Sequence, residues 1–466
     1  MDMSISRRHL LKGIGAGALS TATLTTLGSA MRGFQAANAA EVTDYKALVC
    51  VFMWGGCDTH DVLLPYDQTS YDQFRNIRSS LLASYGASRD RSSLLPLTPA
   101  NSADLGGRQF AMPPEMSGLQ GLFQSGDMAF VANTGPLIRP LNKTQWRDGS
   151  VPVPKQLFSH NDQQSTWSAS APEGAQFGWG GRFADAAVAS GANINREFST
   201  ITSVGNELFL TGQDVLPYQI GLDGAPEIYL LSEYNDDGIS NLLRRHFTAA
   251  EFNGSNLIGR DIAQIADKSV VLNESYNQAV ANLIPISTQF PRSYLGAQLR
   301  SIANTIAIRD SLSVRRQVFY AGIGGFDTHS SQSADLPARL SDVSASITAF
   351  HTAMQELGIA NSVTTFTASE FGRTLSANGD GTDHGWGSHH MVVGGAVQGQ
   401  NIYGEVPPME LGHVQDSDNG RLIPTTSVEQ FAEPLGRWFG LNDNELAAAL
   451  PNLGNFTAAN LAQNIV

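Results

Sequence analysis

Residues 46–54 read KALVCVFMW, and Gly55, Gly56, Cys57 and Asp58 follow them directly. A run of nine residues with one charge, at its first position, is typical of a strand buried on both faces, and the paired glycines end it. Buried strands of this kind occur in parallel sheets covered by helices on both sides. The stretch therefore predicts an α/β fold, with Asp58 just beyond the end of a buried strand.

The same alternation of apolar runs and helical patterns continues along the chain. The predicted strands are 47–54, 127–133, 226–231, 316–321, 362–368 and 390–397. The predicted helices are 336–357, where apolar side chains recur every three or four positions, and 258–283, 293–310 and 427–439. This order predicts a three-layer α/β/α sandwich with a mostly parallel central sheet. We expect a single domain over 40–466, with long insertions around 88–117 and 135–180, which are rich in Gly, Pro, Ser and Asn.

The composition excludes several classes of protein. With 42% apolar and 15% charged residues the chain is neither disordered nor fibrous. Its 43 acidic against 29 basic residues argue against a nucleic-acid or anionic-membrane partner. Two cysteines cannot form a disulfide scaffold or a four-cysteine zinc site. Because an extended strand would separate Cys50 and Cys57 by about 20 Å, we predict two buried free thiols.

The first forty residues have the features of an export signal. Arg7 and Arg8 precede a charge-free stretch from Gly13 to Met31, and a small-x-small site ends at Ala39. The paired arginines resemble the twin-arginine (Tat) signal. The alternative is a membrane anchor, but the stretch is too rich in Gly and Thr for a good span. We predict a cleaved signal peptide over 1–39, export to the periplasm or cell surface through the Tat translocon, and no stable membrane span afterwards. Cleavage would change the formal net charge from −14 to −17.

Three predicted strands are each followed by a Gly or Ser and then a carboxylate. The side chains delivered in this way are Asp58, Asp327 with His329 two positions on, and Glu370. Because ligand sites in parallel sheets lie at the carboxyl ends of the strands, we expect these groups to converge. A cluster of carboxylates requires a cation, and imidazoles beside it extend the choice from calcium to zinc, manganese or iron. A fourth segment, GTDHGWGSHH over 381–390, adds Asp383 and His384.

Each of these signals has a common structural explanation when taken alone. An Asp after paired glycines is usually a turn residue or a helix N-cap. His351 lies inside a predicted helix and is expected to be a helix residue and not a ligand. The DSDNG stretch at 416–420 resembles a calcium loop, but it has no closing Glu and is expected to be a turn. The chain has no G-x-S-x-G, H-E-x-x-H or Walker motif.

Seven stretches together resemble the domain-of-unknown-function family fifteen-oh-one, a group of exported bacterial proteins. They are VFMWGGCDTHDVLLPYD, FSHNDQQSTW, GWGGRFADA, GGFDTHSSQ, SEFGRT, GTDHGWGSHHMVVGGAVQGQNIYGE and the twin-arginine start. The family is distantly similar to the alkaline phosphatase and sulfatase superfamily. That resemblance implies an alkaline phosphatase-like α/β domain with one or two metal ions at the carboxyl edge of its sheet.

The resemblance also implies roles for single residues. Asp58 lies where the superfamily has its first metal-bridging aspartate. Asp327 and His329 resemble an Asp…His ligand pair, although they are two positions apart where the superfamily has four. Glu370 lies where a strand normally ends in Asp-His, and Phe371 replaces that histidine. His384 resembles the late histidine ligand, and the further candidates beside it are Asp383, His389 and His390. The missing imidazole puts a second metal in doubt.

The superfamily nucleophile is a Ser, Thr or modified Cys at a helix start after the second strand. Ser159, beside His160, is the best candidate, and its alternative role is a helix N-cap. Thr134 is the second choice, while Cys57 follows the wrong strand. Arg373 could hold an oxyanion of the substrate or pair with a carboxylate of the cluster, and both remain open.

These patterns lead to two functional hypotheses. The first is an exported metal-dependent hydrolase acting on phosphate or sulfate esters, of small molecules or polymers. The second is a non-catalytic exported protein, for binding or surface assembly, whose metal site is structural or degenerate. In both cases we expect one pocket to contain Asp58, Asp327, His329, Glu370 and His384.

Overall fold

The structure of the protein, a computed structural model, describes residues 42–226, 257–456 and 465–466. Within this part of the chain, residues Asp44–Val466 form one compact unit. No helix among the described residues is long and apolar enough to cross a membrane.

The centre of the unit is a nine-stranded sheet. Its strands are β1 (Lys46–Trp54), β5 (Met128–Gly135), β6 (Thr200–Thr202), β7 (Tyr218–Gln219), β8 (Arg316–Gly324), β9 (Val363–Ala368), β10 (Ser388–Val393), β11 (Ile402–Tyr403) and β12 (Thr426–Ser427). The order across the sheet is β11-β5-β10-β9-β1-β8-β6-β7, and β12 pairs with β5. Every pair is parallel except the two made by β10, which is antiparallel to both β5 and β9.

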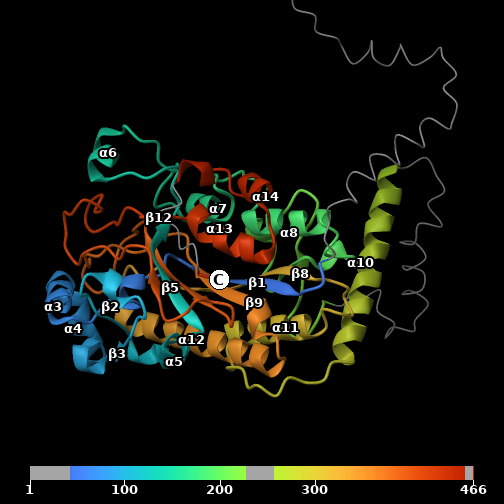
Figure 1. Ribbon diagram of the computed structural model, residues 1–466, viewed down its shortest axis with the longest axis horizontal. Coiled ribbons are helices and arrows are strands. Elements are labelled where there is room, and N and C mark those ends of the chain that lie inside the picture. Colours follow the sequence, from blue (N-terminus) through green and yellow to red (C-terminus); the bar gives the residue numbers. More distant parts are fainter. Residues whose placement is uncertain (1–41, 227–256, 457–464) are drawn as a thin grey trace, which may run out of the picture. The chain divides into compact units, whose positions relative to one another are not determined.

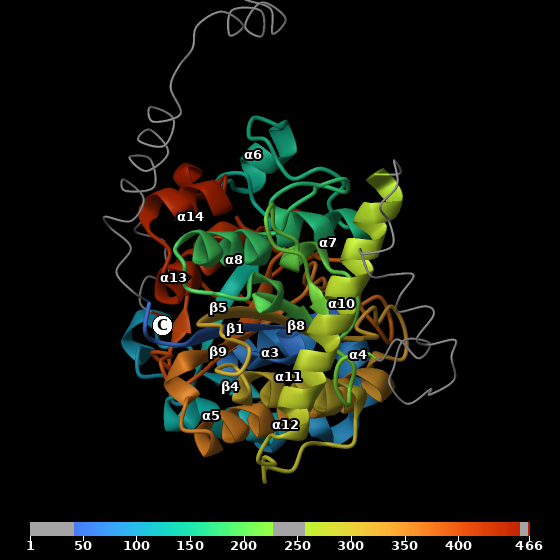
Figure 2. The ribbon, with the colours of Figure 1, turned by 90° about the vertical axis from the view of Figure 1, so that its right-hand side faces the viewer.

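Helices cover both faces of this sheet (Figures 1 and 2). One layer contains α7 (His160–Ala169), α8 (Trp179–Ala189), α13 (Val428–Phe439) and α14 (Asp443–Ala449). The other contains α5 (Ser117–Ser125), α11 (Tyr294–Ala307) and α12 (Gln332–Glu356). The other α-helices of the described residues are α3 (Gln68–Ile77), α4 (Ser79–Tyr85), α6 (Lys143–Asp148) and α10 (Leu257–Ala281). The predicted three-layer α/β/α sandwich with a mostly parallel sheet is confirmed.

The predicted elements correspond closely to the observed ones. Five of the six predicted strands are present as β1, β5, β8, β9 and β10, while the strand predicted at 226–231 falls on 227–256, outside the described residues. The helix predicted to begin at Leu336 begins at Gln332, because its first turn is polar and apolar spacing cannot detect it. The strand predicted at 390–397 ends at Val393, before Gly394 and Gly395.

The two segments predicted as insertions contain secondary structure of their own. Residues 88–117 include β3 (Leu95–Pro96) and β4 (Phe110–Met112), which join β2 (Leu64–Pro65) in a small three-stranded antiparallel sheet. Residues 135–180 include α6 and α7.

Strand β1 lies in the middle of the sheet and determines where the site forms. Its residues from Ala47 to Met53 are at most 1% exposed, and each large apolar side chain buried in this way contributes about 1.5–3 kcal/mol. Cys50 and Cys57 are buried free thiols, as predicted. Because β1 pairs in parallel with both β8 and β9, the carboxyl ends of these three strands lie side by side.

Candidate metal centre

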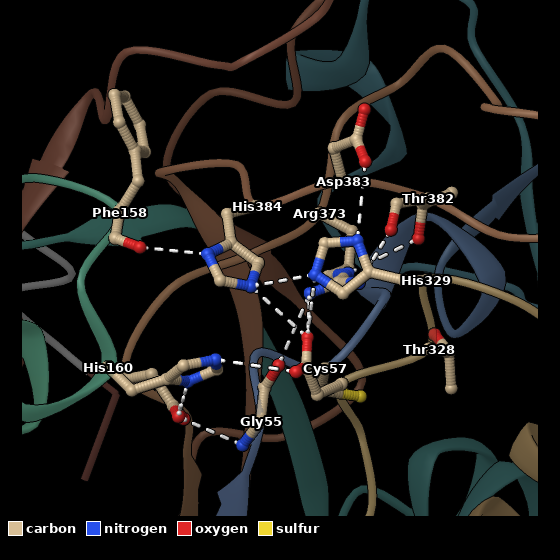
Figure 3. Close-up of polar contacts among 12 residues, drawn as sticks. Gly55, Cys57, Phe158, His160, Thr328, His329, Arg373, Thr382, Asp383 and His384 are labelled. Carbon is tan, nitrogen blue, oxygen red and sulfur yellow. Dashed lines mark hydrogen bonds and ion pairs between the residues drawn. The ribbon is translucent and has the colours of Figure 1, made fainter.

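Four segments distant in sequence bring polar side chains to this edge of the sheet (Figure 3). The loop after β8 carries Asp327 and His329, and the loop after β9 carries Glu370 and Arg373. The segment before β10 carries Asp383 and His384. The first residue of α7 is His160. The edge predicted from the strand ends is therefore the place where the site forms.

Three imidazoles converge on the carboxylate of Asp327. Its Oδ1 lies 3.1 Å from Nε2 of His384 and 3.1 Å from Nε2 of His329, and its Oδ2 lies 3.5 Å from Nε2 of His160. The Nε2 atoms of His329 and His384 are 3.0 Å apart. The ligand atoms of His160, Asp327 and His384 all lie within 4.8 Å of one another, which is close enough for a single metal ion. These four side chains form the cluster that we call the candidate centre.

The opposite ring nitrogen of each histidine is held by an oxygen acceptor. Each Nδ1 makes one such contact: His160 with Glu370 Oε1 at 2.9 Å, His329 with Asp383 Oδ1 at 3.3 Å, and His384 with the Phe158 carbonyl at 2.8 Å. A carbonyl or a carboxylate accepts hydrogen bonds, so we assign the ring proton to Nδ1 in all three rings. The Nε2 lone pairs then face Asp327. Histidine ligands of metals in proteins show the same arrangement.

The pKa shifts fit a cation at this point. Burial lowers the pKa of His384, so its ring is neutral and its Nε2 is free to bind a metal. Partial burial raises the pKa of Asp327, but the hydrogen bond and charge of Arg373 outweigh it and the net shift is downward. Neutral imidazole nitrogens and an ionised carboxylate this close repel one another unless a proton or a metal ion lies between them.

In the metal-free protein, Nε2 of His160 can carry a proton at the position where the metal ion would bind. The hydrogen bond that His160 donates to Glu370 raises the pKa of His160, against a smaller opposing effect of burial. In the metal-free protein a proton on Nε2 would face Oδ2 of Asp327. Metal binding would have to displace that proton.

The centre is open to solvent on one side. The side chains of Asp327 and His329 are 44% and 46% exposed, while that of Glu370 is fully buried. A structural zinc site is normally closed, whereas a catalytic site keeps an open coordination position. The observed exposure is that of an open site and not of a closed one.

Arg373 lies beneath Asp327 and its side chain is buried. Its Nη1 donates to Asp327 Oδ1 at 2.9 Å, and its Nη2 donates to the Thr382 carbonyl at 2.5 Å. Of the two roles left open by the sequence, the structure shows the salt bridge to a cluster carboxylate. Burial lowers the pKa of Arg373, although its pairing with Asp327 opposes this shift.

Asp58 does not reach the candidate centre. Its carboxylate is fully buried and accepts hydrogen bonds from Nη1 and Nη2 of Arg78, at 2.5 and 3.0 Å, and from Nε2 of Gln332 at 2.6 Å. Arg78, at the junction of α3 and α4, neutralises Asp58, which leaves no unpaired charge for a metal ion. The sequence correctly placed Asp58 just after the end of a buried strand, but it could not show that Arg78 pairs with this carboxylate.

Glu370 and Asp383 contact the histidines of the candidate centre on the side away from Asp327. Glu370 Oε1 accepts from the backbone N–H of Gly55, from His160 and from Nε2 of Gln164. Asp383 Oδ1 accepts from Asn378 and faces Nδ1 of His329. In this arrangement both carboxylates orient histidines and do not face the position of a metal ion.

Ser159 is the N-cap residue of α7, but its side chain makes no capping bond to the backbone. Its hydroxyl donates to Asp162 Oδ2 at 3.0 Å, one turn into the same helix. The residue is adjacent in sequence to His160, so it lies at the margin of the candidate centre. Of the other histidines considered, His389 accepts from the Asn133 N–H, and His390 is buried against Trp167 and Phe431.

His160 is the one residue of the centre that the sequence argument did not propose as a ligand. It is separated by more than 160 residues from His329 and His384, where the histidines are concentrated. Its only local signal is its position directly after Ser159, at the start of a helix within FSHNDQQSTW.

Comparisons with known proteins add a partial family match. A search of curated proteins found no match. Among solved structures, the crystal structure of PsFucS1 sulfatase from Pseudoalteromonas sp. is 7% identical, with a TM-score of 0.32, over 91% of this chain and 73% of that chain. A similarity of that size carries no argument about function. A family described as "Protein of unknown function (DUF1501)" matches residues 264–450, the part that contains Asp327, His329 and His384 but not His160.

Proposed function

We propose that this protein binds one divalent transition metal ion at His160, Asp327, His329 and His384 and hydrolyses phosphate or sulfate esters. The observation that carries the proposal is the common geometry of the three histidines. Each has Nδ1 held by an acceptor oxygen, and each directs Nε2 at the Asp327 carboxylate.

The ligand set favours some metals over others. Three imidazole nitrogens and one carboxylate suit zinc, manganese or iron, whereas calcium takes oxygen ligands almost throughout. Among the described residues, His160, Asp327 and His384 form the one group whose ligand atoms all lie within 4.8 Å of one another, and His329 Nε2 lies 3.1 Å from Asp327, so we propose a mononuclear site.

The metal ion, when bound, would supply a Lewis acid for the ester oxygens. The protein itself contributes the other elements of the reaction. Arg373 keeps Asp327 ionised and fixes its orientation. Glu370, Asp383 and the Phe158 carbonyl hold the three rings, which limits the motion of the Nε2 atoms that would bind the metal. The exposed side of the centre admits the ester and water.

Two groups are candidates for the attack on the ester, namely water and the Ser159 hydroxyl. The Ser159 hydroxyl donates to Asp162, and no imidazole of the described residues accepts a hydrogen bond from it. We therefore propose water as the nucleophile and assign Ser159 a role at the start of α7.

The test is the hydrolysis of aryl phosphates and aryl sulfates by protein loaded in turn with zinc, manganese and iron. We expect turnover with at least one metal, retention of most of it in Ser159→Ala, and its loss in Asp327→Asn. Loss of turnover in Ser159→Ala with metal affinity unchanged would show that water is not the nucleophile. A metal-loaded protein without turnover on any ester would contradict the hydrolase and support the non-catalytic alternative.

We further propose that the protein acts after export through the twin-arginine route. The support is the sequence around Arg7 and Arg8, together with the small-residue site before residue 40. Replacing both arginines by lysine should leave the protein in the cytoplasm, which cell fractionation would show.

A further inference from the structure

Arg421 lies beside the candidate centre and contacts His384 and Phe158. Its Nε donates to the carbonyl oxygen of His384 at 2.9 Å. Its guanidinium lies over the ring of Phe158, 5.2 Å from the centroid. Phe158 in turn accepts the Nδ1 proton of His384 with its carbonyl. Arg421 is therefore held by the backbone of His384 and by the ring of Phe158, the residue whose carbonyl orients the His384 imidazole.

The other two nitrogens of this guanidinium are unused. Nη1 and Nη2 of Arg421 have no hydrogen-bond or ion-pair partner within the described parts of the chain, and the residue is half-buried. Two other arginines near the carboxyl edge differ in this respect. Arg373 uses both Nη atoms on Asp327 and Thr382, and Arg78 uses both on Asp58. Arg421 alone among these three has a free pair of donors.

The nearby carboxylates are already engaged by other groups. Asp327 pairs with Arg373, and Asp383 accepts from Asn378 and faces His329. Partial burial raises the pKa of Asp383, and the charge of Arg421 is among the effects that make the net shift downward. The two side chains share no hydrogen bond or ion pair in the described structure, so Nη1 and Nη2 of Arg421 stay unused. Since its Nε bond and the aromatic ring already restrict the side chain, little further entropy would be lost when an anion binds.

We propose that Arg421 binds an oxyanion of the substrate, with Nη1 and Nη2 donating to two oxygens of a tetrahedral anionic group whose third oxygen faces the metal position. A planar guanidinium matches two oxygens of phosphate or sulfate, which a lysine cannot reproduce. This inference rests on the proposed function and deepens it, because it names the residue that would hold the anionic group of the ester.

The experiment uses inorganic phosphate and, separately, sulfate as probes of the metal-loaded full-length protein. Binding is measured by calorimetry for the wild type, Arg421→Gln and Arg421→Lys, with Arg75→Gln as the matched control. Arg75 is exposed on α3 and has no hydrogen bond or ion pair within the described structure. Metal affinity of each protein is measured in parallel by competition with a chelator.

We expect Arg421→Gln to weaken binding of the anion about tenfold or more, while metal affinity changes less than threefold. Arg421→Lys should bind with intermediate affinity, and Arg75→Gln should bind as the wild type does. Tighter binding of phosphate would indicate phosphate esters as substrates, and tighter binding of sulfate would indicate sulfate esters.

Two results would overturn the inference while leaving the proposed metal site intact. One is unchanged anion affinity in Arg421→Gln. The other is an equal loss of anion and metal affinity in Arg421→Gln and Arg421→Lys, which would show that Arg421 only supports His384. A wild-type protein that binds no metal would instead contradict the proposed function itself.

Discussion

Asp383 shows how a single residue behind the ligands can control the candidate centre. Its Oδ1 faces Nδ1 of His329 and is held by Asn378, so it determines the orientation of that ring. Replacing Asp383 by Ala should weaken metal binding by about 10- to 100-fold, as is usual for carboxylates that orient metal-binding histidines.

Competition with a chromogenic chelator measures this change. Asp335→Ala is the control, because Asp335 is an exposed carboxylate on α12 without a hydrogen bond or ion pair in the described structure. Equal affinities for Asp383→Ala and Asp335→Ala would contradict the role of Asp383.

Single residues of the candidate centre were predictable where sequence order coincides with spatial order. Asp327, His329 and His384 follow or precede buried strands at the predicted edge, and the structure brings them together. Asp58 satisfies the same rule but meets Arg78, whose position depends on how α3 and α4 pack. His160 is found only once the start of α7 is placed beside the loop after β9. Partners supplied by distant segments leave no local pattern in the sequence.

At the scale of elements, α12 connects the two loops that carry the ligands. Its first residue, Gln332, is fully buried, and Oε1 accepts from the hydroxyls of Thr328 and Thr382 at 3.0 and 2.8 Å. Thr328 lies between Asp327 and His329, and Thr382 precedes Asp383. One amide therefore fixes the loop after β8 and the segment before β10.

Replacing Gln332 by Leu should weaken metal binding about tenfold or more and lower the free energy of unfolding by about 1–3 kcal/mol. The reason is that Asp58 and the two threonine hydroxyls would lose a buried partner. Urea unfolding and chelator competition measure the two effects. Gln278→Leu, at an exposed position on α10 without a side-chain hydrogen bond in the described structure, should change neither. A similar loss in both variants would refute the role of Gln332.

The positions of the strands along the chain were easier to predict than their directions in the sheet. Apolar runs located β1, β5, β8, β9 and β10, because burial on both faces requires such runs. They could not show that β10 is antiparallel to its neighbours, since a strand buries the same side chains in either direction. The direction of β10 places His384 before the strand, at the same edge as the residues that follow β8 and β9.

For the molecule as a whole, three buried histidines make its stability depend on pH. Burial lowers the pKa of His60 and of His390 to about 3, and that of His389 to about 4. In the unfolded chain each would titrate near a pKa of about 6.5. Below that pH the unfolded state takes up protons that the folded state does not, so stability falls as pH decreases from about 6.5 to 4.

Each such histidine contributes a slope of about 1.4 kcal/mol per pH unit, or about 4 kcal/mol per pH unit for the three. Urea unfolding of metal-free protein between pH 8 and pH 5, with a chelator present, measures this. In His390→Leu the slope of the unfolding free energy against pH should be smaller by about 1.4 kcal/mol per pH unit, the contribution of one proton. The reason is that neither ring nitrogen of His390 has a partner in the described structure. A slope equal to that of the wild type would contradict this account.

The central claim is a single metal site built from His160, Asp327, His329 and His384, and metal content after loading tests it most directly. The full-length protein, Asp327→Asn and Asp335→Asn are each incubated with zinc, dialysed against buffer without metal, and analysed by mass spectrometry of the elements. We predict one zinc ion per chain for the wild type and for Asp335→Asn, and almost none for Asp327→Asn. A wild-type protein that retains no more zinc than Asp327→Asn would contradict the account.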